Sequence, residues 1–125
     1  MLRRESRLRK PGDFRLAMRA GHRSGSSLLS AHLLVAGSGG VHPPRETRVG
    51  FVVSRAVGSA VVRNRVKRRL RELMRVRLAT LPEGSLLVVR AHPAAAGASQ
   101  ADLAADLDLV IGRLLRRQVG ALRQK

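Results

Sequence analysis

The sequence predicts a single domain that combines α-helices and β-strands, in the order helix, strand, strand, helix, strand, helix. Its length of 125 residues, 44% of them hydrophobic, is enough for one modest core. Segments with the two-residue alternation of a strand are interspersed with segments whose apolar residues recur at helical spacing. The strand-like segments 48–54 and 85–91 flank a predicted helix, so they should lie parallel in one sheet, as neighbours or near-neighbours.

The first third of the chain contains a predicted helix and a predicted strand. Residues 1–12 form a basic arm, and Asp13 is a reasonable N-cap for a helix that ends at Gly21. A short additional strand fits residues 22–26. The segment 28–36 alternates as a strand does. The predicted core face consists of Leu29, Ala31, Leu33 and Val35. The opposite face consists of Ser30, His32 and Leu34.

The rest of the chain is divided by Gly, Pro and Ser into further elements. Residues 37–47 are expected to form a loop, of the kind that connects the two strands of a hairpin. In the strand that follows, Val49, Phe51 and Val53 should face the core. The remaining predicted elements are a helix over about 59–78, a buried strand over 85–91, a helix from Ser99 to about Val119, and a frayed tail over 120–125.

The helix over 59–78 carries the most unusual feature of the sequence. Between Arg63 and Glu72, six of ten residues are cationic and one is anionic. Val62, Val66, Leu70 and Leu73 fall within about 40° of one line on a helical projection, so one stripe can be buried while cations cover most of the circumference. A solvated basic face is the usual reading of a charge run. This density of like charge opposes helix formation, however, and an anionic partner would relieve the repulsion.

The overall charge also indicates a polyanionic partner. The net charge is +17, and residues 1–77 hold 19 Lys and Arg against 4 Asp and Glu. Nucleic acid is the first candidate and an anionic membrane surface the second. The sequence has no cysteine, which excludes disulfides and thiolate metal sites. It has neither a membrane-spanning apolar run nor the apolar segment of a signal peptide, so we expect a cytoplasmic protein.

The residues that could carry chemistry are few. Four histidines fall in different segments without metal-ligand spacing, and Asp102 and Asp106 are expected on the solvent face of the last helix. We therefore predict neither a catalytic residue nor a metal site in this chain. Phe14 and Phe51 are the only aromatic residues, too few for a base-stacking platform. Backbone-led, weakly sequence-specific RNA binding fits these features better than readout of a base sequence.

The segment Arg63-Asn-Arg-Val-Lys-Arg-Arg-Leu-Arg-Glu72, preceded by Val57-Gly-Ser-Ala-Val-Val62, resembles the signature helix of the bacterial ribonuclease P protein family. The resemblance extends over about residues 5–118 and includes Asp13-Phe14 and the strands before and after the helix. It implies an α+β fold, a single-domain α/β sandwich of order αβββαβα over residues 1–125, similar to domain 2 of ribosomal protein S5. It also implies a left-handed βαβ crossover through the basic helix, against the usual rule.

The resemblance further implies a function and a set of sites. The family's protein assists a catalytic RNA in the endonucleolytic removal of the 5′ leader from precursor tRNA, which leaves a tRNA 5′-phosphate. The catalytic groups and most Mg²⁺ ions belong to the RNA, and no protein partner is required. Residues expected to contact the catalytic RNA are Arg63, Asn64, Arg65, Lys67, Arg68 and Arg71. Residues expected in the leader-binding cleft are Phe14, Met18, His32, Ser54 and Arg55.

Several of these positions depart from the family pattern. Met18 stands where many members have a second aromatic residue, and His32 where a tyrosine is common. Arg55 and Ala56 replace two lysines.

The alternative to a ribonuclease P protein is a ribosomal or other structured-RNA binding protein with no part in cleavage. A basic protein that adsorbs to membranes is a poorer candidate, because the basic helix has no aromatic residue on its apolar stripe.

Overall fold

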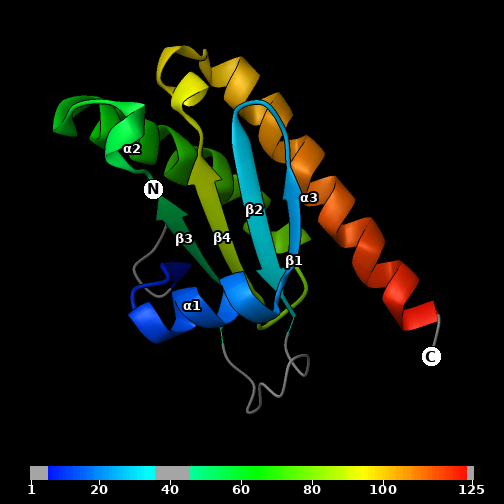
Figure 1. Ribbon diagram of the computed structural model, residues 1–125. Coiled ribbons are helices and arrows are strands. Elements are labelled where there is room, and N and C mark those ends of the chain that lie inside the picture. The colour runs from blue at the N-terminus through cyan, green and yellow to red at the C-terminus, as the bar shows by residue number, and fades with distance from the viewer. Residues whose placement is uncertain (1–5, 36–45, 124–125) are drawn as a thin grey trace.

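The computed structural model describes residues 6–35 and 46–123, with side chains up to residue 117. A single sheet lies between one helix on its front and two helices on its back (Figure 1). The helices and strands follow the order αβββαβα, which confirms the predicted fold. They are α1 (Pro11–Ala20), β1 (His22–Gly25), β2 (Leu29–Leu34), β3 (Arg48–Val52), α2 (Ala60–Arg77), β4 (Leu86–Ala91) and α3 (Gln100–Arg123), with 3-10 turns at Arg55–Val57 (η2), Leu78–Thr80 (η3) and Pro93–Gly97 (η4).

The strand order in the sheet is β1-β2-β4-β3. β1 and β2 form an antiparallel hairpin, β2 and β4 are antiparallel, and β3 and β4 are parallel neighbours, as predicted. The expected hairpin between β2 and β3 is wrong, because β4 is inserted between them; residues 36–45 of that connection lie outside the described part of the chain. With α2 behind the sheet, the chain steps from β3 on the left to β4 on the right, so the crossover is left-handed (Figure 1).

Both faces of the sheet are covered, but not to the same extent. The back face packs on α2 and α3 and forms the main core, to which Leu29, Ala31 and Leu33 of β2 contribute. On the front face, Leu34 of β2 joins a smaller cluster under α1. The predicted alternation of β2 is confirmed, with both sets buried. α1 crosses only one end of the front face (Figure 1).

The start of α1 differs from the prediction. The helix begins at Pro11, and Asp13 lies inside its first turn instead of capping it. Proline suits a first helical turn because its missing N–H has no partner to lose there. The helix ends at Gly21, as predicted. A Cβ at Gly21 would overlap the carbonyl oxygen of Ala17 and lie 2.8 Å from that of Leu33, so glycine allows α1 to turn directly against β2.

The N-terminal arm is attached to the edge of the sheet. Arg7 forms a parallel bridge with Val49 of β3, and the amide of Leu8 donates to the carbonyl of Val49 at 2.8 Å. The side chain of Leu8 is buried in the cluster under α1. The arm therefore extends the sheet beyond β3 and brings its cations next to α2.

α3 is capped as predicted and is longer than predicted. The hydroxyl of Ser99 accepts from the amide of Asp102 at 3.1 Å, and the helix continues past Gly120 to Arg123. The expected solvent exposure of Asp106 is wrong: the side chain is buried and its Oδ2 accepts from the amide of Leu29 at 2.9 Å. Its position on the helix face that meets β2 explains the burial.

No helix in the described residues is both long and apolar enough to cross a membrane.

Candidate RNA interface

α2 is fixed to the sheet by one apolar stripe. The hydroxyl of Ser59 accepts from the amide of Val62 at 3.3 Å and caps the helix. Val66, Leu70 and Met74 are fully buried in the main core, while Val62 and Leu73 pack at its margin. The predicted stripe is confirmed, with Met74 as an addition. Since the stripe is anchored, the orientation of the cations on the rest of the helix is fixed as well.

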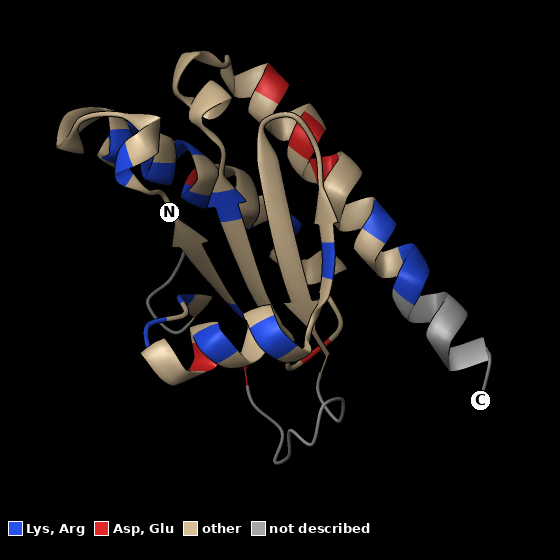
Figure 2. Ribbon diagram, in the orientation of Figure 1, with Lys and Arg blue, Asp and Glu red and all other residues tan. Residues whose placement is uncertain are grey.

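Among the residues that the structure describes, the cations of α2 from Arg63 to Arg71 form no ion pair with an acid. Within the described residues, the ion pairs of α2 link Arg75 with Glu72 at 3.1 Å and Arg77 with Asp108 at 2.7 Å. Both lie in the second half of the helix. All six predicted RNA-binding residues lie on α2, whose lysines and arginines are coloured blue in Figure 2. Asn64, Arg65 and Arg68 are exposed, and Arg63, Lys67 and Arg71 are half-buried.

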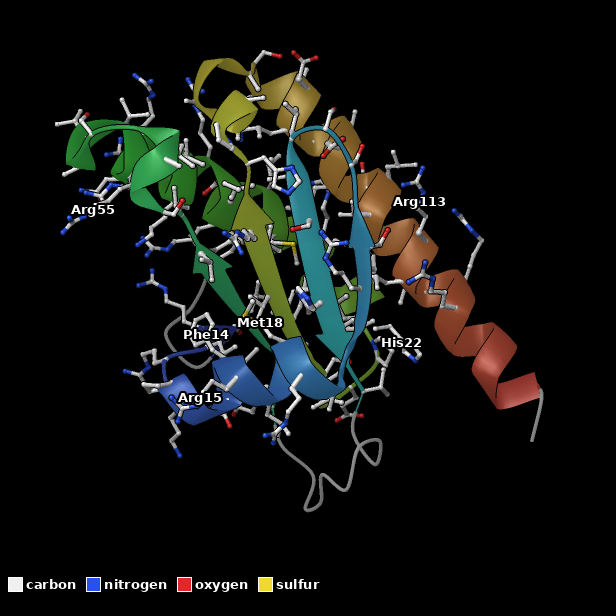
Figure 3. The ribbon with its side chains drawn as sticks, in the orientation of Figure 1. Phe14, Arg15, Met18, His22, Arg55 and Arg113 are labelled. Carbon is white, nitrogen blue, oxygen red and sulfur yellow. The ribbon has the colours of Figure 1, made fainter. Side chains whose placement is uncertain are left out.

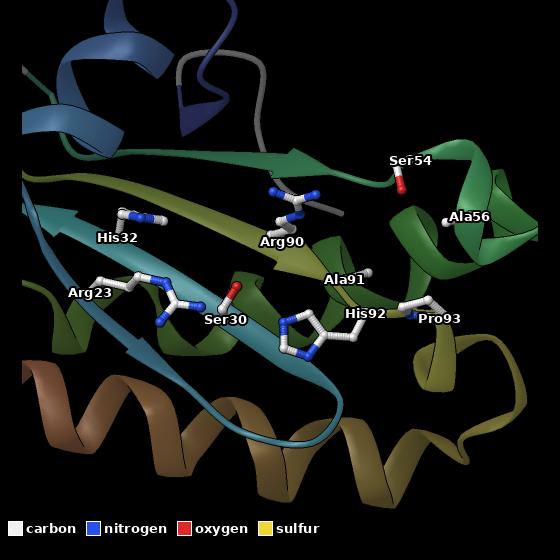
Figure 4. A pocket seen from close by; sticks show the side chains of 9 residues that line it. All are labelled: Arg23, Ser30, His32, Ser54, Ala56, Arg90, Ala91, His92 and Pro93. Atoms are coloured by element: carbon white, nitrogen blue, oxygen red, sulfur yellow. The ribbon is translucent and has the colours of Figure 1, made fainter.

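A cationic hollow of about 240 Å³ lies on the open end of the sheet's front face, and we call it the sheet-face hollow (Figure 4). Arg23 of β1 and Arg90 of β4 reach into it from either side of β2, which contributes Ser30 and His32. No carboxylate lines it within the part of the chain that the structure describes. Its lining is Arg23, Ser30, His32, Ser54, Ala56, Arg90, Ala91, His92 and Pro93.

His32 is the buried polar group of this hollow. Its side chain is only 9% exposed, and its Nδ1 is buried without a hydrogen-bond partner among the described residues. Burial lowers the pKa of His32 below 6.5, and the charges of Arg23 and Arg90 lower it further. The imidazole is therefore neutral at pH 7. A neutral ring with an unpaired nitrogen can bond to a nucleotide and can stack on a base.

A second cationic hollow, of about 290 Å³, lies between the N-terminal arm, β3 and α2, and we call it the β3-edge hollow. Phe14 forms part of its wall and covers Gly50 of β3, where a Cβ would overlap the phenyl ring. Among the described residues, no carboxylate lines this hollow either. Its lining is Arg7, Leu8, Arg9, Phe14, Val49, Gly50, Phe51, Lys67 and Arg71.

The structure distributes the predicted leader-cleft residues over several places. His32 and Ser54 share the sheet-face hollow, whereas Phe14 lies in the β3-edge hollow with Lys67 and Arg71. Met18 and Arg55 are exposed and line neither hollow; Figure 3 shows Met18 on α1 and Arg55 at the other end of the sheet, beside the start of α2.

Sequence reasoning missed Arg23, Arg90, Arg7 and Arg9 as members of these sites. Arg90 could have been found, because it is the one charged residue in the otherwise apolar strand Leu86–Ala91. Arg23 becomes recognisable only once β1 is paired with β2, since it then lies opposite His32. Both arginines face the same side of the sheet as His32, and this arrangement defines the hollow.

These features together define a class of protein. Two hollows whose described lining contains guanidinium groups and no carboxylate, beside a helix with exposed cations, suit the phosphates of a polynucleotide. Small hollows with neutral polar groups suit unstacked bases, which RNA presents in single-stranded segments. The fold and the site are therefore those of a basic α+β domain that binds RNA.

Comparison with known proteins narrows this class to one family. The family model described as ribonuclease P matches residues 2–115. The ribonuclease P protein component of Streptomyces avermitilis is 57% identical over 119 residues, which cover 92% of this chain and 96% of that protein. The corresponding protein of a Nocardioides species is 52% identical over 114 residues, with coverage of 91% and 95%.

Solved structures agree with this result. The ribonuclease P protein of Thermotoga maritima is 25% identical and superposes with a TM-score of 0.69 over 88% of this chain and 96% of that one. The Staphylococcus aureus protein, 23% identical with a TM-score of 0.73, shares the fold over 86% and 93% of the two chains. The chain belongs to the ribonuclease P protein family. It is an RNA-binding subunit with a role in tRNA 5′ processing, and it works in association with an endoribonuclease.

Proposed function

We propose that α2 holds the catalytic RNA of ribonuclease P while the sheet-face hollow holds the 5′ leader of precursor tRNA. The unneutralised cations of α2 carry the first half of this proposal. Arg65 and Arg68 are exposed on one side of a helix whose other side is anchored in the core. Such a rigid row of guanidinium groups binds phosphates without reading base sequence. The proposed contacts to the catalytic RNA are Arg63, Asn64, Arg65, Lys67, Arg68 and Arg71.

The assignment of the leader to the sheet-face hollow is supported by its chemistry. Arg23 and Arg90 provide two cations for consecutive phosphates, and the neutral His32 lies between them on β2. Ser30 and Ser54 add hydroxyl groups, which donate and accept hydrogen bonds. A single-stranded leader fits this combination, because its bases are free to enter a hollow and its phosphates remain outside.

Phe14 and its neighbours connect the two halves of the interface. Phe14 lines the β3-edge hollow beside Lys67 and Arg71, which we assign to the catalytic RNA. We place a leader nucleotide near the junction of the two RNAs here, with its base on Phe14 and its phosphate at the cations of the arm and α2. Met18 and Arg55 are placed at the margins of the leader path, because both are exposed.

We assign the chemistry of cleavage, and the Mg²⁺ ions that it needs, to the catalytic RNA. Neither hollow fits Mg²⁺, since the described residues that line them include guanidinium groups and no carboxylate, the ligand that this ion prefers. A divalent cation would also be repelled by Arg23 and Arg90. The role of this chain is therefore to bind and position, and phosphate neutralisation by its cations lowers the Mg²⁺ concentration that the assembly requires.

The proposal is tested by cleavage of a precursor tRNA by the catalytic RNA at limiting Mg²⁺, with and without the protein. We expect the protein to raise the cleavage rate and to tighten binding of the precursor more than binding of mature tRNA. High Mg²⁺ should reduce the difference, because the ion then replaces the protein's cations at the phosphates. An unchanged rate and unchanged affinity at limiting Mg²⁺ would favour the alternative, a structured-RNA binding protein with no part in cleavage.

The buried His32 gives the protein a measurable pH dependence. Its pKa is lowered in the folded chain, so its contribution to stability is complete above the ordinary value of 6.5 and is lost as the pH falls through 6.5 towards the lowered value. Urea unfolding between pH 7.5 and pH 5 should show a steeper decline for the wild type than for His32→Gln. Arg90→Gln should raise the pKa of His32, as followed by NMR of the ring. Equal pH slopes in wild type and His32→Gln would contradict the burial of a neutral ring.

A further inference from the structure

A third group of cations lies at the edge of the sheet formed by β1, opposite the edge at β3 and its attached arm. Nη1 of Arg113 on α3 donates to the carbonyl of Gly25 at 3.1 Å, and Nη1 of Arg117 donates to the carbonyl of Arg23. All three arginines are exposed. We call Arg23, Arg113 and Arg117 the β1-edge ridge; Figure 3 labels Arg113 on α3 beside this edge.

The acids of α3 do not neutralise this ridge. They lie in the first half of the helix and the arginines in the second, as Figure 2 shows. Asp106 is buried on the amide of Leu29, and Asp108 is paired with Arg77 of α2. Within the described residues, neither Arg113 nor Arg117 forms an ion pair. The net charge of residues 78–125 is only +2, so the sequence alone does not indicate a basic surface here.

The ridge is also held in place before any ligand arrives. Arg113 and Arg117 are one helical turn apart, about 6 Å along the axis, and their carbonyl acceptors are two residues apart on a strand, which is about 6.6 Å. The two spacings match, so both hydrogen bonds form together. Each guanidinium uses one of five N–H groups in this way and keeps others for a phosphate. Such fixed donors lose little side-chain entropy on binding.

The ridge continues the sheet-face hollow. Arg23 lines that hollow with its side chain, and its carbonyl accepts from Arg117. We propose that the β1-edge ridge binds the phosphates of leader nucleotides that extend beyond the sheet-face hollow, so that longer leaders are bound more tightly. This inference rests on the proposed assignment of the leader to that hollow. The ridge residues are all arginines, so the added affinity depends on leader length and salt and not on leader sequence.

The test measures binding of precursor tRNAs to the assembled protein–RNA enzyme. One precursor has a leader just long enough to fill the sheet-face hollow, and the other has a leader extended by several nucleotides. We expect the wild type to bind the longer leader more tightly. In the double variant Arg113→Gln/Arg117→Gln this gain should be lost. Because each single-strand phosphate contact adds about 0.7 to the salt slope, the slope with the longer leader should be lower by about 1.4.

Two further variants separate the proposed role from others. Arg113→Lys/Arg117→Lys keeps both charges and should keep most of the salt slope. Arg116→Gln removes one charge from the same helix turn without touching β1, and it should keep the gain from leader length. Glutamine can still donate to the β1 carbonyls. If the glutamine double variant retains the full gain, the two arginines only stabilise the strand edge and the proposal is wrong.

The outcome also distinguishes failure of the ridge from failure of the proposed function. If the wild-type protein does not favour precursor over mature tRNA at all, the leader assignment itself fails. Suppose that the wild type favours the precursor but gains no affinity from the longer leader, or that Arg116→Gln loses as much of this gain as the double variant. The proposal for the β1-edge ridge is then wrong, while the leader assignment stands. Thermal unfolding of every variant verifies that each is folded.

Discussion

Replacing Arg65 and Arg68 together by alanine is expected to weaken binding of the protein to the catalytic RNA about a hundredfold. Both side chains are exposed, and neither has an acidic partner in the described residues. A hydrogen bond between charged groups contributes about 1.5 kcal/mol, and tenfold in affinity is about 1.4 kcal/mol. Losing two phosphate contacts should also lower the slope of log affinity against log salt by about 1.8.

The salt slope is the informative part of this experiment, because a misfolded variant would lose affinity without a defined change in slope. Arg75→Ala is a suitable control on the same helix. Arg75 is also exposed, but its guanidinium is paired with the carboxylate of Glu72 at 3.1 Å. The hydrogen bond from Arg75 lowers the pKa of Glu72. The control should change the affinity little. An unaltered salt slope in the double variant would mean that Arg65 and Arg68 touch no phosphate.

Replacing Arg23 and Arg90 together by glutamine is expected to remove most of the preference for precursor over mature tRNA. These two guanidinium groups supply the positive charge of the sheet-face hollow, in whose described lining there is no acid. With about 1.5 kcal/mol for each charged contact, binding of the precursor should weaken about a hundredfold. Binding of mature tRNA, which has no leader, should weaken much less. Dissociation constants for both RNAs with the assembled enzyme test this expectation.

Arg19→Gln serves as the control for this variant. Arg19 is exposed in the last turn of α1 and lines neither hollow. The substitution Arg19→Gln removes one positive charge from α1 without changing the proposed leader site. The preference for precursor over mature tRNA should therefore remain. If Arg23→Gln/Arg90→Gln weakens binding of precursor and mature tRNA equally, the leader does not bind in the sheet-face hollow.

The parts of the fold that depend on local patterns could be predicted from the sequence. α2 is recognisable because Val66 and Leu70 recur at helical spacing within a run of charge, and Ser59 caps it. The parallel pairing of β3 and β4 follows from the helix between them. The insertion of β4 between β2 and β3 could not be predicted, because it depends on contacts between residues far apart in the chain. A hairpin is the expected result when only neighbouring segments are considered.

The same distinction applies to the site. The cations of α2 are visible in the sequence as one run, whereas the sheet-face hollow combines residues from β1, β2, β4 and the segment after β3. Phe14 illustrates the difficulty. The family resemblance implies that Phe14 shares the leader cleft with His32, but Phe14 covers Gly50 and lines the β3-edge hollow with Lys67 and Arg71. Only the missing side chain at Gly50 makes room for it, and this pairing between α1 and β3 has no local signal.

The protection of the sheet's two edges has a consequence for the protein before it meets RNA. An exposed strand edge is a template on which a second chain can add, and this is a common route to aggregation. Here the arm residues Arg7 and Leu8 occupy the edge of β3, and Arg113 and Arg117 occupy carbonyls at the edge of β1. Folded chains are therefore expected to resist edge-to-edge assembly, and mutual repulsion at a net charge of +17 keeps them further apart.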